Sequence, residues 1–175
     1  IVVDRPRLEA NIAAMGELAR VHGLALRPHV KTHKCLEIAR MQMGHGAVGL
    51  TASKPGEARV FVEAGFPSIT VAYPVVESGA GQGLESRELD RLLQAAKDRN
   101  TDLRFIADSP EGVVALSRVS QRHSFSLGVF IKIDVGLHRC GLQEHDPSLV
   151  PLADEIARAP GLELCGILSH AGQAY

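Results

Sequence analysis

The chain has 175 residues, a length that suits one domain with a sizeable core. Hydrophobic residues make up 45% and charged residues 22%, and the formal net charge is −1. This charge balance gives no electrostatic basis for binding nucleic acid or an anionic membrane surface. Five Phe and two Tyr are too few for a base-stacking platform, and no apolar run approaches the ~20 residues of a membrane span. We therefore expect neither nucleic acid nor a membrane as partner.

The cysteines indicate a reducing compartment. Cys35, Cys140 and Cys165 are odd in number and widely spaced. A disulfide framework needs pairs, and a zinc ribbon needs ligands a few residues apart. We expect reduced thiols and a cytoplasmic protein. No secretory signal is visible, although the chain begins at Ile1 without a methionine.

The first part of the chain alternates short apolar runs with helical patterns. The expected strands are 1–3, 24–30, 47–50 and 68–72. The expected helices run from Asp4 to Gly23, from Cys35 to Gly44 and from Ser53 to Gly65. Asp4 and Ser53 are candidate N-caps, because each is followed by a proline in the first turn.

The second part continues the alternation after a glycine-rich stretch at 77–85, which lacks the lysine and hydroxyl residue of a phosphate loop and is interpreted as a connection. The expected strands are 103–107, 127–135 and 162–169. Helices are expected to start at Ser86, Ser109 and Asp146. Ser109-Pro110-Glu111 is a strong start, because it combines a cap, a proline and an acid in the first turn.

Strands separated by helices imply parallel pairing through right-handed crossovers. No GxGxxG follows the first strand, so a dinucleotide-binding sheet has little support. A (β/α)₈ TIM barrel of the α/β class fits better, but such a barrel needs about 250 residues. The chain ends after the expected sixth barrel strand. The pattern therefore predicts an incomplete, amino-terminal portion of a barrel.

A basic octet, Arg27-Pro-His-Val-Lys-Thr-His-Lys34, places Lys31 where an expected strand gives way to a loop. Ligands bind at the carboxyl ends of such strands, and a lysine held there can attack a carbonyl carbon to form a Schiff base. By composition alone, a solvated basic turn is the commoner outcome. His29 and His33 share a face with Lys31 on an extended chain, but we see no complete set of metal ligands beside them.

Two later segments also follow expected strands. One is Asp134-Val-Gly-Leu-His-Arg139-Cys-Gly141, in which glycines permit a tight exit from the strand and Arg139 can point at a ligand. The other is His170-Ala-Gly-Gln-Ala-Tyr175, at the end of 162–169. Taken singly, such residues are more often a solvent-exposed arginine and a structural histidine.

Together and in this order, the three segments resemble the D-threonine aldolase and D-serine dehydratase family, whose amino-terminal barrel is similar to that of alanine racemase. The resemblance implies that pyridoxal 5'-phosphate forms an internal aldimine with Lys31 and not with Lys34. It places Arg139 at the phenolic oxygen of the cofactor, His170 near its ring and Tyr175 near its phosphate. Asp134 is structural in this interpretation.

The resemblance further implies that residues 1–175 are the amino-terminal part of one cofactor-binding barrel domain. The last barrel strands and a carboxy-terminal β-domain, which carries a divalent metal in the family and helps to build a homodimer, would lie beyond Tyr175. The implied function is a lyase that acts on β-hydroxy D-amino acids. Two alternatives stay open, a non-catalytic pyridoxal-phosphate carrier and an amino-acid racemase of the same fold. The length of the parent gene would separate a carrier from a lyase.

Overall fold

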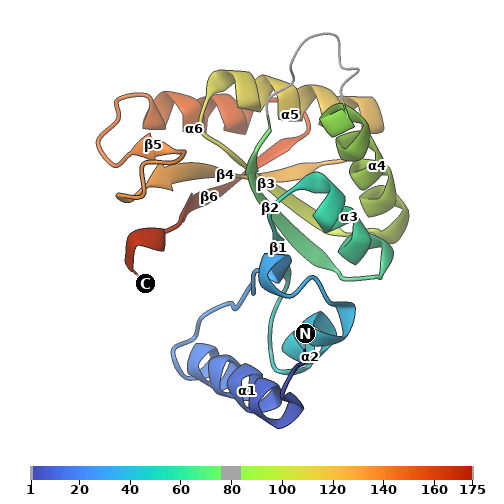
Figure 1. Cartoon of the computed structure of the whole chain (residues 1–175). Helices are drawn as coiled ribbons and strands as arrows, with labels where there is room; N and C mark the ends of the chain where they lie inside the picture. Colours follow the sequence, from blue (N-terminus) through green and yellow to red (C-terminus); the bar gives the residue numbers. More distant parts are fainter. Residues whose placement is uncertain (1, 76–83, 175) are drawn as a thin grey trace.

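The computed structural model describes residues 2–75 and 84–174 (Figure 1). Within this part of the chain, six strands form one parallel sheet. Its neighbours in order are β1 (Leu50–Ala52), β2 (Ser68–Pro74), β3 (Asp102–Ala107), β4 (Leu127–Asp134) and β6 (Leu162–Ser169), while the short β5 (Leu142–Gln143) pairs with the end of β4. The parallel α/β architecture predicted from the strand–helix alternation is confirmed.

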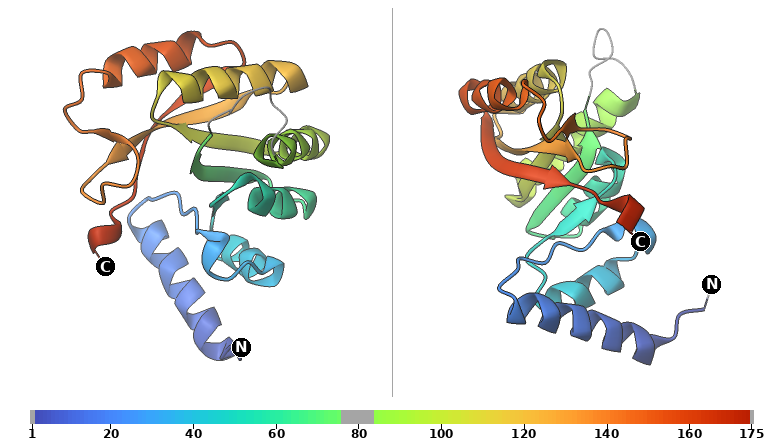
Figure 2. Two further views of the ribbon diagram at one scale, coloured as in Figure 1. Left: turned by 45° about the horizontal axis from the view of Figure 1, so that its top comes forward. Right: turned by 90° about the vertical axis from the view of Figure 1, so that its left-hand side faces the viewer.

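Four helices follow one another along one face of the sheet (Figures 1 and 2). They are α3 (Pro55–Glu63), α4 (Leu84–Arg99), α5 (Pro110–His123) and α6 (Leu149–Arg158). Two others, α1 (Arg5–Val21) and α2 (Leu36–Gly44), pack against each other beside β1. Two 3₁₀ turns, η1 (Val30–Thr32) and η2 (Gly172–Ala174), carry the first and last of the three motifs.

The core lies between the sheet and helices α3–α6. Phe105 and Leu103 of β3 are at most 1% exposed and pack in one apolar cluster with Leu93, Leu116 and Ile156 of the helices. Successive side chains of a strand point to opposite faces. The other face of β2 and β3 is therefore lined by polar residues, namely Ser68, Thr70, Asp102 and Arg104.

The segment 24–30, predicted as a strand, is not one. It runs in an irregular extended form, makes a single parallel bridge between His29 and Thr51, and turns into η1 at Val30. Pro28 has no N–H to donate, so a regular ladder cannot run through this point. Lys31 consequently lies inside a 3₁₀ turn and not at the end of a strand, so the shared extended face predicted for His29, Lys31 and His33 is also wrong.

Other boundaries differ from the prediction. Val2 and Val3 form no strand and are 97% and 55% exposed. The strand predicted at 47–50 is found at Leu50–Ala52. The glycine-rich stretch falls mostly in 76–83, outside the described residues, and its end belongs to α4.

Two predicted helix starts are confirmed. The side chains of Asp4 and Ser109 accept hydrogen bonds from backbone N–H groups three residues later, at 3.1 and 3.2 Å. Ser53 is not the N-cap, because α3 begins at Pro55 and its N-cap is Lys54; the N–H and hydroxyl of Ser53 donate to Glu57 Oε2, at 2.7 and 2.9 Å. Ser86 lies inside α4, which begins at Leu84.

The last helix also starts later than predicted. Asp146 accepts hydrogen bonds from the N–H and hydroxyl of Ser148, and α6 begins after Ser148. Asp146 thus forms a turn that precedes the helix. Among residues 2–75 and 84–174, no helix is long and apolar enough to cross a membrane.

Candidate active site

The turn η1 presents the side chain of Lys31 to solvent and fixes its backbone locally. His29 is the N-cap of the turn, and its Nδ1 accepts a hydrogen bond from the Lys31 N–H at 3.3 Å. Thr32 Oγ1 donates to the carbonyl of His29 at 3.4 Å. Because His29 Nδ1 is an acceptor here, the proton of the neutral imidazole sits on Nε2.

The loop that carries Arg139 is held by two carboxylates. Asp134 accepts hydrogen bonds at 3.0 Å from the N–H groups of Gly136 and His138. The hydrogen bond from the His138 N–H has the largest effect on the pKa of Asp134 and lowers it, while burial acts in the opposite direction. Asp108, after β3, accepts a bond from the Gly141 N–H at 3.0 Å. The structural role predicted for Asp134 agrees with these contacts.

His170 follows the last residue of β6, and the chain then turns through η2. A Cβ on Gly172 would lie 2.9 Å from His170 Nε2, so glycine leaves room for the imidazole. Gln173 Nε2 donates to the carbonyl of Val135 at 2.6 Å, which joins the third motif to the Arg139 loop. Tyr175 lies outside the described residues.

These elements enclose one open cavity of about 780 Å³. Lys31, Arg139 and His170, each from a different motif, all line it. Its basic and imidazole lining is Arg27, His29, Lys31, Lys132, Arg139 and His170. No carboxylate occurs among the described residues of the lining, so the cavity suits an anionic ligand.

Burial and charge keep the imidazoles of the cavity neutral near pH 7. Burial first, and then the charge of Lys31, lower the pKa of His29 to about 4. Burial, followed by the charges of Lys31 and Arg139, also lowers the pKa of His170. Both rings can therefore contact an anionic ligand as neutral hydrogen-bonding groups.

Lys34 lies apart from this cavity. It lines a neighbouring cavity of about 660 Å³, in which its ammonium is 3.8 Å from Glu57 Oε1. The side chain of Glu57 is only 5% exposed, so the carboxylate and the ammonium compensate each other's charge. Of the two lysines in the basic octet, Lys31 is the one that shares a cavity with Arg139 and His170.

Lys132 is a lining residue that the sequence analysis missed. It is 4% exposed, lies on β4 between two isoleucines, and reaches the cavity. Burial lowers the pKa of its ammonium. The sequence could have indicated this residue, because a lysine between two isoleucines of a buried strand is seldom fully buried without a partner or ligand.

A family model for the alanine racemase N-terminal domain matches residues 3–175. The chain belongs to this family. The 3-hydroxy-D-aspartate aldolase of Paracoccus denitrificans is 32% identical over 174 residues, which are 99% of this chain and 42% of that protein. The D-threo-3-hydroxyaspartate dehydratase of Delftia sp. (strain HT23) is 33% identical over 99% of this chain and 43% of that protein.

A solved D-threonine aldolase from Filomicrobium marinum has the same fold, with a TM-score of 0.84 and 31% identity over 95% of this chain and 42% of that chain. The resemblance inferred from the three motifs is confirmed by these relatives. The chain spans less than half the length of each of them.

The residues of this alanine racemase N-terminal domain fit pyridoxal phosphate chemically. The cofactor carries a phosphate and a phenolic oxygen, and a cavity with several cations and no lining carboxylate can compensate both. It also needs an amine within reach, which Lys31 provides. A metal site is not evident in the part of the chain that the structure describes, where no three His, Cys, Asp or Glu side chains converge.

We predict that Gly141→Ala disturbs the Arg139 loop more than a strained backbone alone would. Gly141 has φ +107°, and a Cβ there would lie 2.8 Å from Asp134 N and 2.9 Å from Ile133 C, backbone atoms that cannot move aside. Gly65→Ala is the matched control, because Gly65 has φ +88° and open space around its Cβ position. The left-handed backbone alone should lower the free energy of unfolding of each variant by about 1–2 kcal/mol. In urea unfolding, Gly141→Ala should show a larger decrease than Gly65→Ala. Equal losses would contradict the prediction.

The depressed pKa of His29 predicts a pH dependence of stability. Between the ordinary value of 6.5 and about 4, the unfolded chain binds a proton at this residue that the folded chain does not. The free energy of unfolding should therefore fall as the pH drops through this window, and His29→Gln should remove that part of the fall. NMR titration of the imidazole checks the pKa directly, and titration of His29 near 6.5 would show the prediction to be wrong.

Proposed function

We propose that this chain supplies the cofactor lysine and one wall of the active site in a pyridoxal-phosphate-dependent lyase that acts on β-hydroxy D-amino acids. One observation carries the proposal: residues from three separate motifs, Lys31, Arg139 and His170, line a single cation-rich cavity. Relatives that match nearly the whole chain are named as aldolases and a dehydratase of such amino acids. Their names favour a lyase over a racemase.

In this proposal Lys31 would hold the cofactor through its amine. Its Nζ would also serve as the base that exchanges a proton with the substrate Cα. When bound, the cofactor withdraws electrons from the substrate Cα. In a dehydratase, Lys31 would accept the Cα proton, and the β-hydroxyl would take up a proton and leave as water. In an aldolase, the β-hydroxyl would give its proton to a general base, the Cα–Cβ bond would break to release an aldehyde, and Lys31 would return a proton to Cα to give glycine.

Arg139 and His170 would orient the cofactor. A guanidinium beside the phenolic oxygen stabilises its anionic form, and Asp134 and Asp108 hold the loop that presents it. His170, with its lowered pKa, would lie against the ring as a neutral group. We assign Tyr175 to the phosphate side on the strength of its motif.

The remaining parts of the active site are proposed to lie beyond Tyr175. They are the last barrel strands, a carboxy-terminal β-domain with the ligands of a divalent metal, and the contacts of a homodimer. Within the described residues β6 pairs with β4, and Ile167 on β6 is 72% exposed. An apolar side chain on an edge strand is suited to packing against a further element.

The assignment of Lys31 predicts where the cofactor becomes attached. The complete protein, incubated with pyridoxal phosphate and reduced with borohydride, should carry the label on the peptide that contains Lys31. Lys31→Ala should lose the label and the absorbance of the bound cofactor. Lys34→Ala is the matched control and should keep both, because Lys34 lines the neighbouring cavity. Label on Lys34 in the Lys31→Ala protein would refute the assignment.

The proposed reaction predicts stereospecific cleavage by the complete protein. An aldolase should release glycine from D-threonine or D-3-hydroxyaspartate, and a dehydratase should release ammonia and a keto acid from D-serine or D-3-hydroxyaspartate. The L-isomers should be inert, and a chelator should suppress turnover. A protein that holds the cofactor at Lys31 but is inert to every D-amino acid would instead be a carrier, and interconversion of D- and L-alanine would identify a racemase.

A further inference from the structure

The segment that bears Lys31 has few backbone contacts with the sheet. Between residues 24 and 29 it receives hydrogen bonds from Val48 N–H to Leu26 O at 2.9 Å and from Thr51 N–H to Pro28 O at 2.8 Å. Thr51 Oγ1 also donates to the carbonyl of Arg27, at 3.2 Å. These contacts reach only β1 and the chain just before it, so a regular ladder does not fix the position of the segment.

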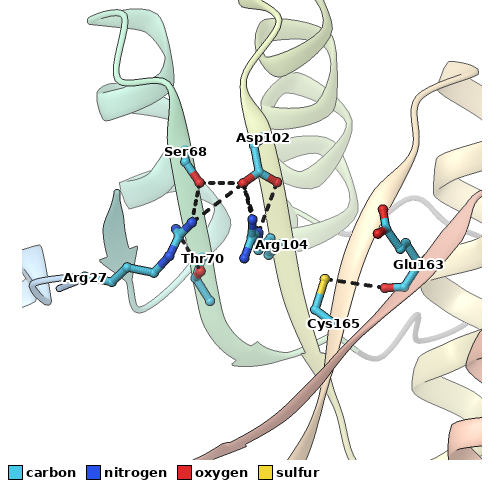
Figure 3. Close-up of polar contacts among 7 residues, drawn as sticks. All are labelled: Arg27, Ser68, Thr70, Asp102, Arg104, Glu163 and Cys165. Atoms are coloured by element: carbon cyan, nitrogen blue, oxygen red, sulfur yellow. Dashed lines mark hydrogen bonds and ion pairs between the residues drawn. The ribbon is translucent and has the colours of Figure 1, made fainter. Parts of the chain in front are cut away.

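The side chain of Arg27 extends further, past β1 to β2 and β3 (Figure 3). Its Nη2 donates to Ser68 Oγ at 2.7 Å and lies 3.7 Å from Asp102 Oδ2. Its Nη1 donates to Thr70 Oγ1 at 3.5 Å. The side chain is only 20% exposed. One guanidinium therefore joins the Lys31 segment to two strands that it does not otherwise pair with.

The groups that receive Arg27 are themselves fixed. Ser68 Oγ accepts from Arg27 and donates to Asp102 Oδ2 at 2.6 Å. Arg104 binds the same carboxylate through Nε at 2.9 Å and Nη2 at 2.7 Å. Burial raises the pKa of Asp102, but the hydrogen bonds from Arg104 and Ser68 outweigh it and lower the pKa overall. Asp102 is thus an anion near neutral pH and compensates both arginines.

An independent observation shows that the backbone makes room for this arginine. Gly49 lies where the chain enters β1, and a Cβ there would be 2.5 Å from Arg27 Nη1 and 2.8 Å from the carbonyl oxygen of Ser68. Any larger residue would push the guanidinium away from Ser68. The close approach of Arg27 to the sheet thus depends on glycine at this position.

We propose that Arg27 is a positioning residue, which fixes Lys31 for reaction with the cofactor by anchoring its segment to Ser68 and Asp102. This inference rests on the proposed role of Lys31. Only Pro28, His29 and Val30 separate Arg27 from Lys31, so a shift of the anchored end moves the amine. A misplacement of about 1 Å can slow a reaction by about a hundredfold. A lysine cannot replace Arg27, because its single ammonium cannot fork between two hydroxyls and a carboxylate.

The test compares Arg27→Lys and Ser68→Ala with Arg158→Lys in the complete protein. Arg158 is the control, because it pairs with Asp154 at 3.3 Å on the surface and is 80% exposed. The first measurement is the rate at which borohydride-trapped label appears on Lys31, with pyridoxal and with pyridoxal phosphate at saturating concentrations. The second is hydrogen exchange at residues 24–31 of the cofactor-free protein, together with its melting temperature.

Positioning predicts that both Arg27→Lys and Ser68→Ala slow the labelling about tenfold or more with either aldehyde. Exchange at 24–31 should accelerate while the rest of the protein keeps its protection, and Arg158→Lys should change neither. If Arg27 only attracts the phosphate, Arg27→Lys keeps its charge and both aldehydes react at the unaltered rate, which would overturn the inference. If the unaltered protein is not labelled at Lys31, the proposed function fails as well. If Lys31 is labelled in the unaltered protein and Ser68→Ala is labelled at the same rate, this inference is wrong while the proposed function stands.

Discussion

The parallel register of β2, β3, β4 and β6 is the constraint on which the site depends. Parallel strands end at the same edge of a sheet, so residues that follow different strands meet there. Arg139 follows β4, and His170 follows β6, which pairs with β4 along its length. Lys31 reaches the same edge through the bridge between His29 and Thr51 of β1. Motifs that are far apart in the sequence therefore line the same cavity.

The same register places charged side chains on the face of the sheet away from the helices. Burying a charge is unfavourable unless it is paired and hydrogen-bonded. Near the amino ends of the strands, Asp102 satisfies this condition for Arg27 and Arg104. At the carboxyl ends, Lys132 and Arg139 line a cavity whose described residues include no carboxylate. The protein thus compensates its own charges at one end and leaves the other end suited to an anionic ligand.

Much of the fold could be predicted because apolar runs coincide with paired strands. The strand 162–169 is found with the predicted bounds, and 103–107 differs by one residue. The strand predicted at 24–30 is wrong although some of its apolar residues are buried or half-buried. Pro28 prevents regular pairing, so only a single bridge forms. The prediction of Ser53 as a cap is wrong by one residue, because α3 begins at Pro55 and Lys54 takes the N-cap position. Lys132 was missed because its burial depends on the neighbouring strands β3 and β6 and the loops beside them, which the local sequence pattern does not show.

The choice between the two lysines shows where sequence reasoning needs the structure. Lys31 and Lys34 are the same residue type in one basic octet, and only resemblance to a family favoured the first. In the structure the turn η1 separates them: Lys34 has φ +49° and faces Glu57, whereas Lys31 faces the cavity with Arg139 and His170. The ammonium of Lys34 lies 3.8 Å from Glu57 Oε1, in a cavity that neither Arg139 nor His170 lines. The turn that interrupts the predicted strand therefore supplies a geometric argument, independent of resemblance, for the proposed role of Lys31.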